Sequence, residues 1–187
     1  MRSYLDFLAI AEKLKCNTRH SWTSTGRRES VAEHSWRLAL MAYLVRDEFP
    51  ELDMDRVIQM CLFHDMGEAV TGDIPAFEKT EQDETVESRA VQTLLGRLPQ
   101  PYAAEVTELF REMDERKTGE AKLYKALDKL EAVIQHNEAD ISTWLPLEYE
   151  LQLTYGEKEC GCFPYIQRLR ELVREDSRAK IKEASEK

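Results

Sequence analysis

The hydrophobic residues of this chain recur mostly three or four positions apart, the spacing that places them on one face of an α-helix. Clusters rich in Gly, Pro, Asn and Asp separate the apolar stripes and favour turns. No two stretches alternate apolar and polar residues around a hairpin signal. The pattern therefore predicts an all-α fold, a helical bundle of about six or more helices with short connections.

Start and stop signals set the expected ends of these helices. The predicted helices cover about residues 3–15, 30–49, 53–70, 81–98, 102–116, 120–136, 147–155 and 164–184. Ser30 and Glu33 have the spacing of a capping box for the second helix, and Asp53 is a suitable N-cap for the third. Residues 16–29 are expected to form a loop.

The same stripes predict which side chains face the core. The residues expected to point inward are Tyr4, Leu5, Leu8 and Ala11 in the first helix, Trp36, Leu38 and Ala42 in the second, Val86, Ala90, Leu94 and Leu95 in the fourth, and Leu123, Leu127, Leu130 and Val133 in the sixth. No linker or repeat divides the chain, so we expect one domain over residues 1–187. Residues 174–187 are too polar to pack, and we expect that end of the last helix to fray.

Composition bounds the cellular setting. The hydrophobic fraction is 42%, and no apolar run reaches the roughly 18 residues that a membrane span requires. The amphipathic N-terminus does not have the pattern of a signal peptide. We therefore expect a cytoplasmic protein with reduced cysteines and no membrane partner. Cys160 and Cys162 lack a second cysteine pair, which favours free thiols over a zinc site.

Charge narrows the range of partners. A net charge of -10 argues against a polynucleotide, because such binding depends on neutralising phosphates. A small phosphorylated ligand remains compatible, since residues 13–28 contain lysines and arginines but no acidic residue. On charge alone, these basic residues are equally well explained as a solvated surface and helix-end partners.

A polar cluster interrupts the apolar run of the third helix. His64 and Asp65 follow Phe63 directly, and Glu68 comes one helical turn later. Burying such groups is costly unless they are paired or bind a metal. Further donors lie on helices expected to pack against this one: His34 and Asp128. Two imidazoles and two carboxylates suit a transition metal with open positions, whereas a His-Asp pair alone is more often a hydrogen-bonded core pair.

The order of these residues resembles a known family. His34, then His64-Asp65, then Asp128 is similar to the pattern of the HD-domain metal-dependent phosphohydrolases, which are all-helical. The strings ESVAEHSWR, FHDMGEAVTGDIP and AKLYKALDKLE resemble more closely the 5'-deoxynucleotidase branch, over about residues 1–140. The resemblance implies an HD-domain bundle that hydrolyses 5'-deoxynucleoside monophosphates to a deoxynucleoside and phosphate, and it suggests a homodimer.

The resemblance also implies roles for individual residues. One divalent metal would bind the four residues His34, His64, Asp65 and Asp128. The sequence does not select among Mn, Co, Zn, Ni, Fe and Mg. Glu68 and Asp73 would orient or deprotonate the attacking water, or hold a second metal.

Arg19 and Trp22 match the positions that bind phosphate and deoxyribose in that branch. Some members have these two residues adjacent, whereas His20 and Ser21 separate them here. Arg27 and Arg28 therefore remain alternatives as phosphate ligands.

Plainer interpretations of the same residues stay open. Glu68 could be a helix-end carboxylate, Asp73 a turn cap and Trp22 a core anchor. His20 and His136 are expected at the surface. The alternative functions are hydrolysis of guanosine tetraphosphate or a cyclic nucleotide, or a non-enzymatic metal-stabilised module that senses a nucleotide. Glu68 and Asp73 favour an enzyme, because a structural metal site has no use for further acids at its open edge.

Overall fold

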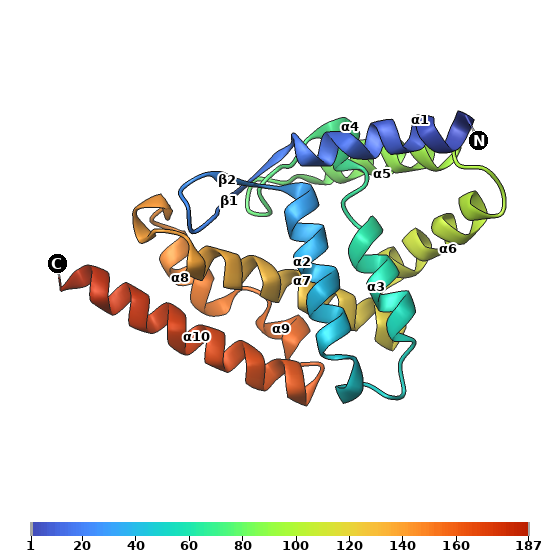
Figure 1. Cartoon of the computed structure of the whole chain (residues 1–187). Coiled ribbons are helices and arrows are strands. Elements are labelled where there is room, and N and C mark those ends of the chain that lie inside the picture. The colour runs from blue at the N-terminus through green and yellow to red at the C-terminus, as the bar shows by residue number, and fades with distance from the viewer. Residues whose placement is uncertain (1, 187) are drawn as a thin grey trace.

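The computed structural model describes residues 2–186, and helices make up most of its regular secondary structure (Figure 1). The α-helices are α1 (Arg2–Ala11), α2 (Val31–Leu44), α3 (Met54–Phe63), α4 (Glu68–Thr71), α5 (Glu81–Leu95), α6 (Tyr102–Glu115), α7 (Gly119–Glu138), α8 (Glu148–Thr154), α9 (Glu157–Cys160) and α10 (Pro164–Ser185). Short 3₁₀ helices are η1 (Glu12–Lys15), η2 (Arg46–Glu48) and η3 (Ile141–Thr143), and two strands are β1 (Thr18–Trp22) and β2 (Arg28–Ser30). The all-α prediction is confirmed.

Helix α7 runs through the middle of the molecule (Figure 1). Helices α2 and α3 pack against it, and so do α9 and α10. The predicted apolar stripe of α7 is buried, as are its partners on α2 and α3: Leu123, Ala126, Leu127, Leu130, Val133, Leu38, Ala42, Val57 and Met60. Because α7 packs against these four helices, its backbone is held in place, and so are the polar side chains that it carries.

Helix α2 begins at the predicted capping box. Ser30 Oγ accepts a hydrogen bond from the Glu33 backbone N–H at 3.3 Å, and Glu33 Oε2 accepts one from the Ser30 N–H at 2.9 Å. Asp53 likewise caps α3, accepting from the Arg56 N–H at 3.1 Å. Such caps contribute about 1 kcal/mol each. The first cap fixes the start of α2 and so the position of His34 one turn later.

The predicted loop over residues 16–29 is instead a small antiparallel hairpin. Strands β1 and β2 pair Thr18 with Ser30 and Trp22 with Arg28, and the register between these two pairs is irregular. Gly26, at φ +80°, supplies the left-handed residue of the connecting turn. The strands are short and β1 is mostly polar, so no alternation marked them in the sequence.

The predicted inner face of the first helix is wrong. Tyr4, Leu5 and Leu8 are about half exposed, and Phe7 is the buried side chain of α1. Helix α1 lies at the edge of the molecule and packs on η1 and α4 (Figure 1). Helix α1 has apolar residues on more than one side and contacts the rest of the protein along only one of them. The sequence pattern alone does not indicate which side that is.

Two further core predictions fail on other helices. Trp36 on α2 is 64% exposed and Val86 on α5 is 50% exposed. Val91 takes the buried position on α5 beside Leu94 and Leu95. On α2 four exposed apolar residues form a second stripe on the side opposite the core: Trp36, Leu40, Tyr43 and Leu44.

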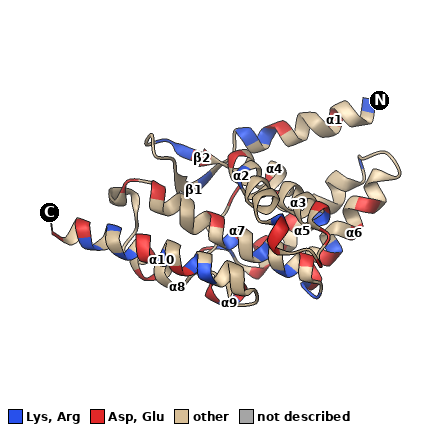
Figure 2. Ribbon diagram, turned by 60° about the horizontal axis from the view of Figure 1, so that its bottom comes forward, with Lys and Arg blue, Asp and Glu red and all other residues tan. Residues whose placement is uncertain are grey.

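The last helix continues to Ser185, and acidic and basic residues are interspersed along it (Figure 2). Its last buried residue is Ser177. Fraying of the polar end stays a prediction. Across residues 2–186, none of the helices is both long enough and apolar enough to cross a membrane.

Candidate active site

The motif predicted inside the third helix lies at its end. Helix α3 stops at Phe63, and a turn through His64 and Asp65 leads to Gly67 and the short α4, which begins at Glu68. A Cβ on Gly67 would lie 2.7 Å from a side-chain carbon of Glu87 on α5. Glycine therefore permits the close packing of the turn on α5, and this packing positions Glu68.

The four predicted metal ligands converge. His34 Nε2 lies 3.1 Å from Asp128 Oδ1 and 3.9 Å from Asp65 Oδ2. His64 Nε2 lies 3.0 Å from Asp65 Oδ2 and 3.6 Å from Asp128 Oδ1. At metal–ligand distances near 2.1 Å, neighbouring ligands of one ion stand about 3.0–3.4 Å apart. Two of the four distances lie in this range and the other two exceed it by up to about 0.5 Å, so the four donors surround a space close to the size that a single divalent ion needs.

Both imidazoles are fixed so that Nε2 faces this cluster. His34 Nδ1 is paired with the carboxylate of Glu131, and His64 Nδ1 donates to the Cys61 carbonyl oxygen at 2.9 Å. Hydrogen bonds of this kind set the ring orientation and raise the basicity of a metal-binding nitrogen. The His64 side chain is nearly buried, and its Nε2 has no hydrogen-bond partner of good geometry within residues 2–186.

Glu131 is a candidate site residue that the sequence pattern did not reveal. It is completely buried on α7, one turn after Asp128, and its other oxygen lies 2.8 Å from Arg37 Nε. Asp128 is held in a similar way, because its Oδ2 accepts from Lys125 Nζ at 2.7 Å. The spacing of Glu131 three residues after Asp128 was the available signal, since it places both carboxylates on one helix face.

The pKa values reflect these contacts. Burial alone would lower the pKa of His64, but Asp65 and Asp128 outweigh it and raise the pKa to about 10. Burial acts to raise the pKa of both carboxyl groups, yet His64 holds that of Asp65 below its ordinary value, and Lys125 does the same for Asp128. A site that favours ionised carboxylates and positive charge suits a cation.

Glu68 and Asp73 lie at the edge of this cluster. Burial, followed by the charges of Asp65 and Asp73, raises the pKa of Glu68 to about 9. Its Oε2 is buried and has no hydrogen-bond partner among residues 2–186. Burial is also the main cause of the raised pKa of Asp73, which is half-buried. Glu68 thus has an unused acceptor oxygen next to the predicted metal ligands.

Arg19 supplies positive charge at the same place. Burial acts to lower its pKa, but Glu131, Asp65 and Glu29 outweigh this effect and raise it. Its Nη1 is buried and has no hydrogen-bond partner in the described part of the chain. An arginine with a free donor beside a metal site is suited to a phosphate oxygen.

The other predicted substrate residues have different surroundings. The Arg28 guanidinium covers the Trp22 ring at 4.5 Å, and Arg27 pairs with the half-buried Glu33. Among residues 2–186, Trp22 does not belong to the lining of the cavity that contains Arg19. A role for Trp22 with deoxyribose stays a prediction.

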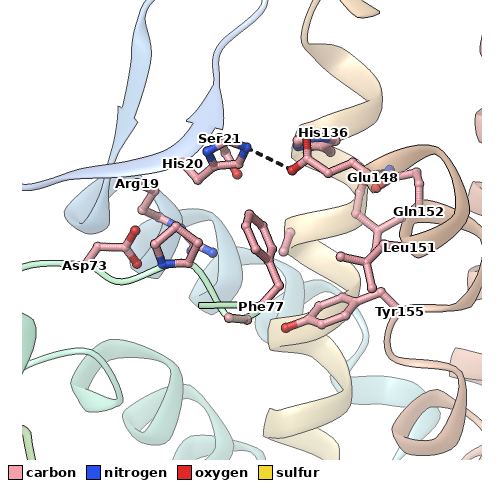
Figure 3. Close-up of a pocket in the computed structure, with 14 residues that line it drawn as sticks. Arg19, His20, Ser21, Asp73, Phe77, His136, Glu148, Leu151, Gln152 and Tyr155 are labelled. Carbon is pink, nitrogen blue, oxygen red and sulfur yellow. Dashed lines mark hydrogen bonds and ion pairs between the residues drawn. The ribbon is translucent and has the colours of Figure 1, made fainter. Parts of the chain in front are cut away.

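That cavity extends from Arg19 and Asp73 to helix α8 (Figure 3). It has a volume of about 610 Å³, part of it open to solvent, within the usual range for small-molecule sites. His20 and His136 both line it. The surface position predicted for His136 is wrong, because its side chain is buried, and His20 is half-buried.

Comparison with known proteins places the chain. A family profile described as "HD domain" matches residues 11–163. The chain belongs to the HD-domain family. The 5'-deoxynucleotidase HDDC2 of Homo sapiens is 34% identical over 141 residues, which cover 73% of this chain and 68% of the human protein. The 5'-deoxynucleotidase hdd1 of Schizosaccharomyces pombe is 30% identical over 175 residues, covering 89% and 82%. The motif resemblance is confirmed.

Solved structures agree with this HD-domain assignment. The crystal structure of a predicted metal-dependent phosphohydrolase from Magnetospirillum magnetotacticum MS-1 has a TM-score of 0.81 at 27% identity, and it covers 96% of this chain and 93% of that one. A conserved hypothetical protein from Pyrococcus furiosus has a TM-score of 0.70 at 30% identity, with coverages of 93% and 99%. The HD-domain match reaches residue 163, further than the resemblance at about residue 140.

Proposed function

We propose that this HD-domain protein is a metal-dependent phosphatase that hydrolyses 5'-deoxynucleoside monophosphates to a deoxynucleoside and phosphate. The names of its relatives support the substrate class. The observation that carries the proposal is a site with two unused groups next to the four convergent donors. Glu68 offers a buried carboxylate oxygen, and Arg19 offers a buried N–H.

The metal ligands would be His34, His64 and Asp65, whose donor atoms lie within 4.8 Å of one another, together with Asp128, whose Oδ1 lies 3.1 Å from His34 Nε2 and 3.6 Å from His64 Nε2. Such an ion neutralises charge on a phosphoryl group and makes a bound water more acidic. Glu68 would accept a hydrogen bond from the attacking water and align it, because a nearby cation favours its ionised form. Arg19 would donate to a phosphate oxygen, and Asp73 would face the same end of the substrate.

The reaction is then a displacement at phosphorus. The water oxygen bonds to phosphorus as Glu68 takes up one of the water protons. The bond from phosphorus to the 5'-oxygen breaks, and the 5'-oxygen gains a proton, so the net reaction moves one proton from water to the leaving oxygen and Glu68 is regenerated when it gives up its proton. A general base of this kind typically contributes about 10²–10⁴-fold to the rate. We expect Glu68→Gln to lower kcat by that factor while the metal content stays unchanged.

Phosphate release across a panel of monophosphates and metals tests the function. With Mn or Co, we expect dAMP, dGMP and dTMP to be hydrolysed faster than the ribonucleotides. Equal rates on 3'-monophosphates would overturn the 5'-specific proposal. His64→Ala and Asp128→Ala should lose both metal and turnover. Asp55→Asn, which changes an exposed carboxylate on α3, is the matched control and should keep both.

The number of metal ions bound per chain distinguishes the two roles proposed for Glu68 and Asp73, which are action on the attacking water and binding of a second metal. One ion per chain is expected if Glu68 and Asp73 act on water. Two ions, with the second lost in Glu68→Gln, would assign these residues to a second metal. The identity of the ion is to be read from the metal that best restores turnover to chelated protein.

We also propose that the chain is one cytoplasmic domain that forms a homodimer and binds no polynucleotide. The net charge of -10 opposes binding to nucleic acid. The four exposed apolar residues at helical spacing on α2 support a dimer contact: Trp36, Leu40, Tyr43 and Leu44. Light scattering should give the mass of a dimer, and Trp36→Glu with Leu44→Glu should give the mass of a monomer.

A further inference from the structure

The cavity beside Arg19 is lined by consecutive residues of β1, which a regular strand does not allow. Side chains alternate between the two faces of a strand, yet Arg19, His20 and Ser21 all contribute to its wall. The irregular register between Thr18 and Trp22 accounts for this arrangement, because a bulge re-aims side chains. As a result His20 stands next to the predicted phosphate-binding arginine, facing the same space.

The two nitrogens of the His20 ring face charged groups from two other elements. Arg28 Nη1 lies 3.4 Å from Nδ1, and since arginine can only donate, Nδ1 is the acceptor. Nε2 then carries the hydrogen and lies 2.9 Å from Glu148 Oε1 on α8 (Figure 3). The contact of Nε2 with Glu148 is an ion pair without good hydrogen-bond geometry. Because both nitrogens face charged groups, the carbon atoms of the ring are the part that it can offer to the cavity.

Aromatic neighbours extend this surface. The Phe77 ring meets His20 at a centroid distance of 5.6 Å and an interplanar angle of 88°, so the two rings form a corner. His136 is stacked behind His20 at 6.2 Å and 27°. Figure 3 shows Phe77 projecting between β1 and the side formed by α7 and α8. Apolar atoms of Leu151 and Tyr155 complete this end of the cavity.

The cavity thus has two chemically different ends. Arg19 and Asp73 lie at the end next to the metal ligands, and the aromatic corner with Glu148 lies at the other. Phosphate needs the first environment, whereas a flat heteroaromatic base stacks in the second. We propose that this cavity binds the nucleoside half of the substrate, with the base stacked in the corner formed by His20 and Phe77.

This inference rests on the proposed function and adds a role for α8. Glu148 is a positioning residue, because it contacts His20 and also lies 3.3 Å from His136 Nε2. It accepts a hydrogen bond from the Leu145 N–H as well, and this bond fixes the carboxylate. His20 would then supply the aromatic face that the sequence assigned to Trp22.

The test compares two substrates that share a phosphate but differ in the base. For dAMP, His20→Ala and Phe77→Ala should each lower kcat/KM about tenfold to a hundredfold, mainly through KM, because base stacking is lost. For 2-deoxyribose 5-phosphate, which has no base, the same variants should stay within twofold of wild type. His20→Phe keeps a flat ring and should retain most of the activity on dAMP.

Glu148→Gln tests positioning. It should raise KM for dAMP in the wild-type background and have a smaller effect in His20→Phe, where Glu148 no longer has an imidazole at position 20 to hold and keeps only its contacts with His136 and the Leu145 N–H. Glu150→Gln, an exposed carboxylate on the same helix, is the matched control and should change neither value. Circular dichroism and thermal unfolding establish whether each variant is folded. If His20→Ala does not fold, Phe77→Ala still tests the base site, because Phe77 is 38% exposed and its truncation should disturb folding little.

Binding of deoxyadenosine, followed by ligand-observed NMR on metal-free protein, gives a readout without turnover. Binding to wild type and loss of binding in His20→Ala would support the inference. The inference would be overturned if the variants lost kcat/KM equally on dAMP and on deoxyribose 5-phosphate. It would also be overturned if wild type hydrolysed the two compounds with the same kcat/KM. If wild type released phosphate from neither compound, the proposed function would fail while the NMR comparison still decided the nucleoside site.

Discussion

The carboxylate of Glu131 gives a sharp test of how the metal site is held. Replacing it with glutamine keeps the size of the side chain but removes the charge that faces His34 Nδ1 and Arg37 Nε. Changing a group that orients a metal-binding histidine typically weakens metal affinity about 10- to 100-fold. At about 1.4 kcal/mol for each factor of ten, this corresponds to about 1.4–2.8 kcal/mol of metal-binding free energy.

A second effect of Glu131→Gln acts on folding. The amide has one acceptor oxygen, so either the buried His34 Nδ1 or the partly exposed Arg37 Nε loses its partner, at a cost of about 1–3 kcal/mol when it is His34. Metal affinity is measured by competition with a chromophoric chelator, and stability by urea unfolding of the metal-free protein. Both should fall.

Glu138→Gln is the control for the loss of charge beside Arg37. Glu138 pairs with the same arginine but is about half exposed, so its contribution should stay within about 1 kcal/mol. We expect metal affinity in this variant to stay within twofold of wild type. A folded Glu131→Gln protein with wild-type metal affinity would refute the role assigned to this carboxylate.

Three further predictions concern stability. Gly67→Ala should destabilise the protein by about 1–3 kcal/mol in urea unfolding and lower turnover, because the added carbon meets α5 and displaces Glu68. Ser30→Ala should cost about 1 kcal/mol in the same assay; an unchanged midpoint would mean that the cap does not stabilise α2. The raised pKa values of His64 (about 10) and Glu68 (about 9) mean that the folded metal-free protein binds more protons than the unfolded chain. Its stability should therefore fall as pH rises from 7 to 10 in calorimetry, and metal binding at pH 7 should release protons; a rise in stability would contradict the assigned sign.

The convergence of the four proposed ligands was predictable because each of these residues is marked locally in the sequence. His34 follows a capping box, the His64-Asp65 pair ends an apolar run, and Asp128 borders an apolar stripe. Each of these signals involves residues within about one helical turn of one another, and spacing over that range predicts which side of a helix a residue occupies. The buried side of α7 was predicted for the same reason.

The nucleoside end of the cavity was not predictable in this way. Its members come from β1, the loop before α5, α7 and α8, and no local pattern relates His20 to Glu148. His136 carries a polar side chain at a helix end, where exposure is the usual outcome, and it is buried only because Trp144 and Glu148 fold back over it. Trp36 fails in the opposite direction, because an aromatic residue on a two-sided helix can face solvent.

The central position of α7 has a consequence for the length of the substrate. Asp128 marks its metal end and His136 the aromatic end of the cavity, and at 1.5 Å of rise per residue these positions lie about 12 Å apart along the axis. A buried helix cannot shorten or lengthen this separation. Under the two proposals together, α7 sets a fixed distance between the site for the phosphate and the site for the base. A deoxynucleoside triphosphate is too long to place its terminal phosphorus at the four ligands and its base at His20 at the same time. The enzyme would therefore select monophosphates over triphosphates by their length.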